Sequence, residues 1–136
     1  GDRMKAPVKK RKPKSELKKL VLECHLLWSK AAKIRDGNQC RVCGGTAGLQ
    51  THHIFSDRMH SSTRYMLSNA ITLCFTHHYP NGHSNPCVMR ENIVQAIGIA
   101  KYKALEEHAF PNTPVKYTVS DLMEIRSQLR QLIGEL

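Results

Sequence analysis

Three stretches of this 136-residue chain place their apolar residues at the spacing of amphipathic α-helices. The first, SELKKLVLECHLLWSKAAKIRDG, ends where Gly37 can stop a helix. The second, VMRENIVQAIGIAKYKALEEHA, is followed by the helix-breaking segment FPNTP. In the third, YTVSDLMEIRSQLRQLIGEL, Thr118 and Asp121 have the spacing of a capping box. The pattern predicts helices over residues 15–35, 88–109 and 118–136.

The segment between the first two helices, about residues 39–83, lacks helical periodicity. Cysteine, histidine, glycine, asparagine and serine accumulate there, and large apolar side chains are few. Hydrophobic burial would stabilise such a centre poorly, so another interaction must hold it. The length of the chain fits one domain, which we place at residues 15–136.

Charge changes the picture at the N-terminus. The formal net charge is +10, and nine lysines and arginines lie between Gly1 and Lys19 against only Asp2 and Glu16. Residues 1–14 also carry two prolines and no apolar periodicity, which predicts a flexible basic arm. Such an arm gains affinity for DNA through counterion release. A solubilising tail, or an arm for an anionic membrane surface, are the alternatives.

Membrane and secretory classes are not expected. Hydrophobic residues make up 40% of the chain, and no run approaches the ~18–20 apolar residues of a membrane span. The basic N-terminus is followed by an amphipathic pattern, whereas a signal peptide needs an apolar segment there. We therefore expect a cytoplasmic protein, in the bacterial host if the chain is phage-encoded.

The cysteines indicate metal binding. An odd count of five in a protein without secretory features argues against a disulfide framework. CRVC and CFTH each separate two ligand residues by the two-residue gap of a zinc knuckle, and thiolates with imidazole suit Zn²⁺. A redox pair at CRVC with a buried third thiol is the alternative. Cys24 and Trp28 lie on the apolar stripe of the first helix and are expected in the core; Cys87 receives no role. The predicted zinc ligands are Cys40, Cys43, Cys74 and His77.

The zinc pairs bracket THHIF and NAITLCFTHH, which together resemble the HNH endonucleases. That family has a histidine pair on a first strand, an asparagine before a second strand, and a histidine at the start of a helix. The residues that carry the resemblance are His52, His53, Asn69 and His78, with His77 where a knuckle cysteine is usual. The resemblance implies an α+β fold: a small zinc-stapled ββα-metal core, at about residues 39–83, flanked by helices.

The same resemblance implies roles for these residues. His52 and His78 would bind a catalytic divalent ion, Mg²⁺ or Mn²⁺ by preference, and His53 would be the general base. Asn69 would hydrogen-bond across the loop and orient His53, although in some relatives this asparagine ligates the metal, and the sequence leaves both open. His83 in PNGHSNP is either a further metal ligand or a loop histidine.

Between the two strands, Arg58 and Arg64 are candidates for phosphate contacts, with scattered surface charge as the alternative. The helical layout, with KIRDGNQCRVCG before the centre, also resembles the phage NinG (Rap) recombination nucleases, which implies cleavage of branched DNA. Those proteins tend to have a single strand histidine, where this chain has two. The expected function is metal-dependent DNA hydrolysis; the alternative is a non-catalytic zinc-stabilised nucleic-acid-binding module. A homodimer would account for two-strand cleavage, and no interface is readable.

Overall fold

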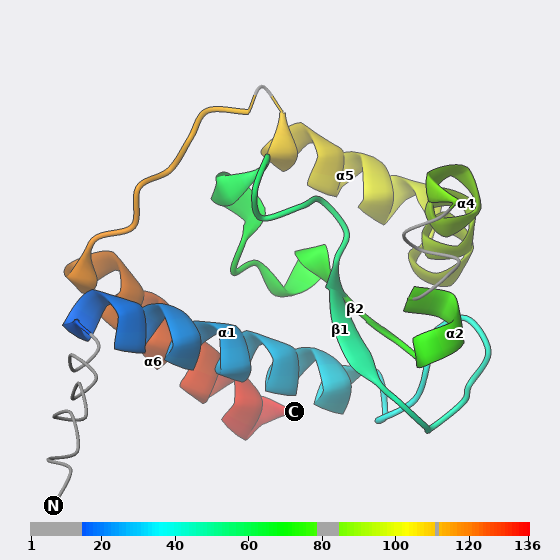
Figure 1. Ribbon diagram of the computed structural model, residues 1–136, viewed down its shortest axis with the longest axis horizontal. Coiled ribbons are helices and arrows are strands. Elements are labelled where there is room, and N and C mark those ends of the chain that lie inside the picture. Colours follow the sequence, from blue (N-terminus) through cyan, green and yellow to red (C-terminus); the bar gives the residue numbers. More distant parts are fainter. Residues whose placement is uncertain (1–14, 79–84, 111) are drawn as a thin grey trace, which may run out of the picture.

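The computed structural model describes residues 15–78, 85–110 and 112–136. It is a mostly helical α+β structure in which one two-stranded antiparallel sheet lies between two groups of helices (Figure 1). The basic arm predicted at residues 1–14 and His83 lie outside the described residues. Among the described residues, no helix is long and apolar enough to cross a membrane.

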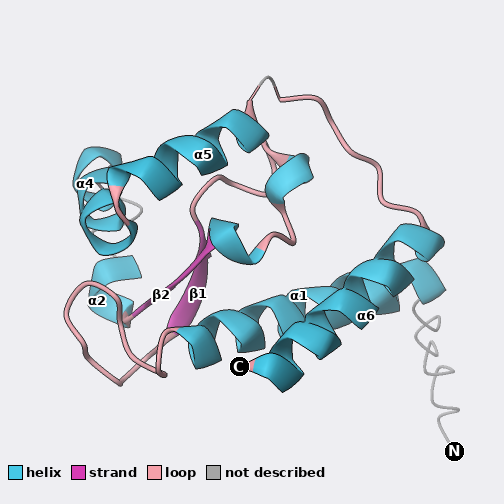
Figure 2. Cartoon of the chain, turned by 180° about the vertical axis from the view of Figure 1, so that it is seen from behind, coloured by secondary structure: helices cyan, strands magenta, loops and turns pink. Residues whose placement is uncertain are grey.

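Helices α1 (Glu16–Arg35) and α6 (Val119–Glu135) pack side by side on one side of the sheet (Figures 1 and 2). The Ser15 side chain caps α1, and α6 begins with the predicted capping box of Thr118 and Asp121. Their shared core contains Cys24 and Trp28, both fully buried as expected. The residues of this core, which we call the α1–α6 core, are Leu20, Cys24, Trp28, Ala32, Tyr65, Ala70, Leu122 and Leu129.

Strands β1 (Gln50–His53) and β2 (Ala70–Leu73) pair antiparallel, with His52 opposite Ile71 and His53 opposite Ala70. Short 3-10 turns η1 (Ser61–Thr63) and η2 (Leu67–Asn69) lie in the connection between them. Because side chains alternate along a strand, Ala70 faces the α1–α6 core while Ile71 and Leu73 face the opposite side.

That opposite side is covered by α2 (Phe75–His78), α4 (Pro86–Ile97) and α5 (Ile99–Ala109). The single helix expected over residues 88–109 is therefore wrong: it is divided at Gly98. Gly98 has φ +91°, a left-handed value that a side-chain-bearing residue rarely adopts, so the helical path breaks there. Met89 and Ile93 of α4 and Tyr102 of α5 then pack together against β2.

Candidate metal centre and histidine site

The four predicted zinc ligands come together at the end of the sheet. Their ligand atoms all lie within 4.8 Å of one another, and they form a set of Cys40, Cys43, Cys74 and His77. The Cys43 and Cys74 sulfurs are 3.7 Å apart, and the Cys74 sulfur is 3.2 Å from His77 Nδ1. Ligands around a tetrahedral zinc are separated by about 3.5–3.8 Å, given metal–ligand distances of about 2.0–2.3 Å. The Cys43–Cys74 and Cys40–His77 separations, both 3.7 Å, fall in this range, whereas the Cys74–His77 separation is shorter; the cluster could hold a structural zinc ion.

The first knuckle is built by the backbone around Cys40. The Gly44 N–H donates to the Cys40 carbonyl at 2.8 Å, and the Val42 N–H donates to the Cys40 sulfur at 3.4 Å. Burial raises the pKa of the Cys40 thiol, but backbone N–H groups at Cys74, Cys43 and Val42 outweigh it and lower that pKa from 9.0 to about 6. A thiol that ionises readily is a better metal ligand at neutral pH.

His52 and His78 lie beside each other, next to the cysteine cluster. The His78 N–H donates to the Cys74 carbonyl at 2.9 Å, which places His78 at the end of the α2 turn. The two imidazole rings meet edge to face, with centroids 5.2 Å apart and planes inclined by 67°. The structure thus brings together these two residues, which are 26 positions apart in the sequence.

His53 occupies the other face of β1, against α1. Its ring stacks on Trp28, with centroids 4.0 Å apart and planes inclined by 14°, and His25 lies 6.0 Å away. His53 Nε2 is 3.1 Å from the Arg64 carbonyl, and because a carbonyl only accepts, Nε2 carries the hydrogen in the neutral ring. The lone pair then resides on Nδ1. Burial lowers the His53 pKa below 6.5, against the opposing effect of the Asp57 carboxylate, so the ring is neutral near pH 7.

Asn69 bridges the connection between the strands through hydrogen bonds to two other residues of that connection. Its amide accepts from the Phe55 N–H at 2.8 Å and donates to the carbonyls of Phe55 and Thr63, at 3.0 and 3.1 Å. The bond to the His53 ring itself is made by the carbonyl of Arg64. Asn69 is fully buried and holds Thr63, whose neighbour in the chain bonds the histidine. Its contribution to His53 is therefore indirect.

Of the two arginines expected to contact phosphates, Arg58 is exposed and Arg64 is half-buried. Arg64 lies 4.0 Å from the Asp57 carboxylate and 5.2 Å from the centre of the Tyr65 ring. Cys87, for which the sequence suggested no role, is exposed on α4 and is not part of the cysteine cluster.

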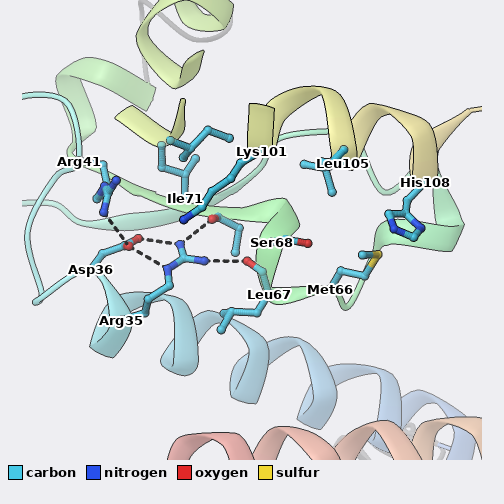
Figure 3. Close-up of a pocket in the computed structure, with 13 residues that line it drawn as sticks. Arg35, Asp36, Arg41, Met66, Leu67, Ser68, Ile71, Lys101, Leu105 and His108 are labelled. Carbon is cyan, nitrogen blue, oxygen red and sulfur yellow. Dashed lines mark hydrogen bonds and ion pairs between the residues drawn. The ribbon is translucent and has the colours of Figure 1, made fainter. Parts of the chain in front are cut away.

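A cavity of about 510 Å³ lies between α1, β2 and α5 (Figure 3). His108 lines this cavity, whereas His52, His53 and His78 do not. One of the cavity's cationic groups is already engaged: Arg35 donates to both carboxylate oxygens of Asp36 and to the carbonyls of Leu67 and Ala70. Asp36 in turn accepts from the Thr72 N–H at 3.0 Å. Arg35 and Asp36 therefore cover the outer edge of β2, a role that the sequence did not suggest.

These features define the candidate site: a Cys3His cluster, a histidine pair beside it, and a third histidine across the strand. Residues that sequence reasoning missed are Trp28 and His25, which contact His53, and the Arg64 carbonyl. A helical spacing of three residues places His25 and Trp28 on one face of α1, and this spacing was visible in the sequence. Comparison with protein-family models, with curated proteins and with solved structures finds no match to this chain.

Proposed function

We propose that this chain is a metal-dependent DNA endonuclease of the HNH type, which hydrolyses phosphodiester bonds. The observation that carries the proposal is the pairing of His52 with His78 of α2, at 5.2 Å between ring centroids, because His52 lies on the strand that also carries His53. A zinc-stabilised module needs only the cysteine cluster and His77. It gives no reason for three further histidines on adjoining elements.

The separation of His52 and His78 suits a shared ion. Two imidazoles bound at about 2.1 Å, with an angle of about 90–110° at the metal, have ring centroids about 4.6–5.3 Å apart. The observed 5.2 Å falls within that interval, and the inclined planes avoid ring overlap. A divalent ion bound there, Mg²⁺ or Mn²⁺, would supply Lewis-acid stabilisation of charge on the phosphate.

His53 has the properties required of a general base. The Arg64 carbonyl fixes the hydrogen on Nε2, so Nδ1 is the atom that can accept a proton from water. A lowered pKa keeps the ring unprotonated and ready to accept that proton at neutral pH. Asn69 contributes by holding the connection that carries Arg64, through its bonds to Phe55 and Thr63.

DNA is the proposed partner because the chain carries a formal net charge of +10, much of it in the N-terminal arm. The resemblance to NinG proteins suggests branched recombination or repair intermediates as substrates. A second candidate function is the non-catalytic zinc-stabilised nucleic-acid-binding module. The cysteine cluster supports it, but the three further histidines do not.

The test compares cleavage of a supercoiled plasmid and a synthetic four-way junction, with Mg²⁺ or Mn²⁺, by the wild type and by His53→Ala. We expect metal-dependent cutting that His53→Ala reduces by at least a hundredfold, within the range of general-base losses (~10²–10⁴). His108→Ala is the matched control, since His108 is an exposed histidine on α5. DNA binding and zinc content should persist in both variants. A zinc-loaded wild type that binds DNA and cuts neither substrate would favour the binding module.

A further inference from the structure

The contacts of Trp28 give α1 a part in the proposed active site. We propose that Trp28 is a positioning residue, whose indole fixes the plane of the His53 ring for proton transfer; this inference rests on the proposed nuclease function. Trp28 is fully buried, and its ring lies nearly parallel to that of His53, at 4.0 Å between centroids and 14° between planes. The sequence accounts for Trp28 only as a core residue.

Two contacts of different kinds constrain His53. Stacking on Trp28 restricts the tilt of the imidazole, and the bond from Nε2 to the Arg64 carbonyl restricts its rotation within that plane. Together they set the direction of the Nδ1 lone pair. A general base works only when that direction meets the proton it accepts, and a misplacement of ~1 Å can cost about a hundredfold in rate.

Trp28 is itself held in place from the same connection that carries Arg64. Its Nε1–H donates to the Met66 carbonyl at 2.8 Å. The segment from Arg64 to Met66 therefore contacts both rings: the Arg64 carbonyl bonds the imidazole, and the Met66 carbonyl bonds the indole. A single short segment of the chain therefore holds both the indole and the imidazole.

The seating of α1 on β1 reinforces this arrangement. The Ser29 hydroxyl lies 2.7 Å from the Thr51 hydroxyl, on the strand face that also carries His53. Adjacent residues of α1, Trp28 and Ser29, thus contact alternate residues of β1. Helix α1 therefore contacts the strand at two points, Thr51 and His53, so the placement of the helix determines the placement of the His53 ring.

The kinetic test compares Trp28→Met with Trp28→Phe in the zinc-loaded full chain. Methionine fills much of the volume without a ring, and we expect kcat to fall roughly tenfold to a hundredfold with KM unchanged. Phenylalanine keeps the ring but not the bond to Met66, and should restore kcat to within about threefold of wild type. The control is Leu129→Ala, which disturbs the same core from α6 and should leave kcat unchanged in folded protein.

A second measurement needs no variant and no activity. Protons above an indole face resonate upfield, so the ring protons of His53 should lie upfield of those of free histidine in the wild-type NMR spectrum. Wild-type kcat in Trp28→Met, or unshifted His53 protons, would overturn the positioning role while leaving the nuclease intact. A wild type that shows the upfield shift but cuts no DNA would overturn the proposed function, and the positioning role with it.

Discussion

Both sides of the two-stranded sheet carry an apolar core, but only the side of α2, α4 and α5 also has a candidate metal cluster among the described residues. On the α1–α6 side, Leu20, Trp28 and Leu122 are buried in a continuous apolar core, and the helices are capped by side chains. At the other side, the end of the sheet is formed by four metal-ligand residues around polar knuckles, with α4 and α5 packed beyond them. The α1–α6 side relies on apolar burial, whereas the cysteine cluster on the other side could gain further stability from a bound ion.

The proposed catalytic groups are divided between these two sides. His53 belongs to the α1–α6 side through its stack on Trp28, and His52 and His78 belong to the cluster side. Alternation along one strand achieves this division within two consecutive residues. An active site built in this way requires both stabilising mechanisms, and each can be removed separately by substitution.

Removal of a zinc ligand should have the largest effect on folding. Cys74→Ser removes a ligand that belongs to the closest pair in the cluster, and we expect loss of the ion, with binding free energy on the order of 10 kcal/mol withdrawn from folding. Atomic emission would measure the zinc content, and amide NMR spectra would measure the folding. We expect the dispersed amide signals of β1, β2 and α2 to be lost. Cys87→Ser, at an exposed cysteine outside the cluster, is the control and should keep both zinc and spectrum. A Cys74→Ser protein with a wild-type spectrum would show that the cluster needs no metal.

Substitution in the α1–α6 core should have the next largest effect. Leu122 is fully buried, and Leu122→Ala is expected to lower the free energy of unfolding by about 2–5 kcal/mol through lost burial and a residual cavity. Its neighbour Met123 is 47% exposed, so Met123→Ala should cost no more than about 0.5 kcal/mol. Urea unfolding measures both variants. Zinc should remain bound in each; its loss from Leu122→Ala would mean that the two sides fold as one unit.

The same contrast explains what could be predicted from the sequence. Helices α1 and α6 follow from a 3.6-residue apolar period, and the Cys3His set follows from two matched two-residue gaps. Both signals are local in the sequence. The division of the helix at Gly98 had a local signal too, a glycine within the pattern, but its left-handed φ is visible only in the structure.

Contacts between distant segments were not predictable in this way. Asn69 was expected to orient His53 from across the loop, but the sequence did not indicate that the Arg64 carbonyl bonds the His53 ring while Asn69 bonds Thr63. The stack of Trp28 on His53 joins residues 25 positions apart, and its only sequence signal was apolar character. Partners of this kind depend on how helix and strand pack, which periodicity does not encode.

Acid pH should produce the smallest effect, and it acts on the α1–α6 side through His25 of α1. Burial lowers the pKa of His25 below 6.5, with Arg64 acting in the same direction and Asp57 opposing. As the pH falls below 6.5, the unfolded chain takes up a proton that the folded chain does not, so stability present above that pH is lost on the way down through the folded pKa. His25→Gln lacks this linkage. The urea midpoint of the zinc-loaded wild type should therefore fall relative to that of His25→Gln between pH 7.5 and 5.5. Loss of zinc in acid affects both proteins alike and cancels in the difference; a constant gap across this range would place His25 in water rather than against Trp28.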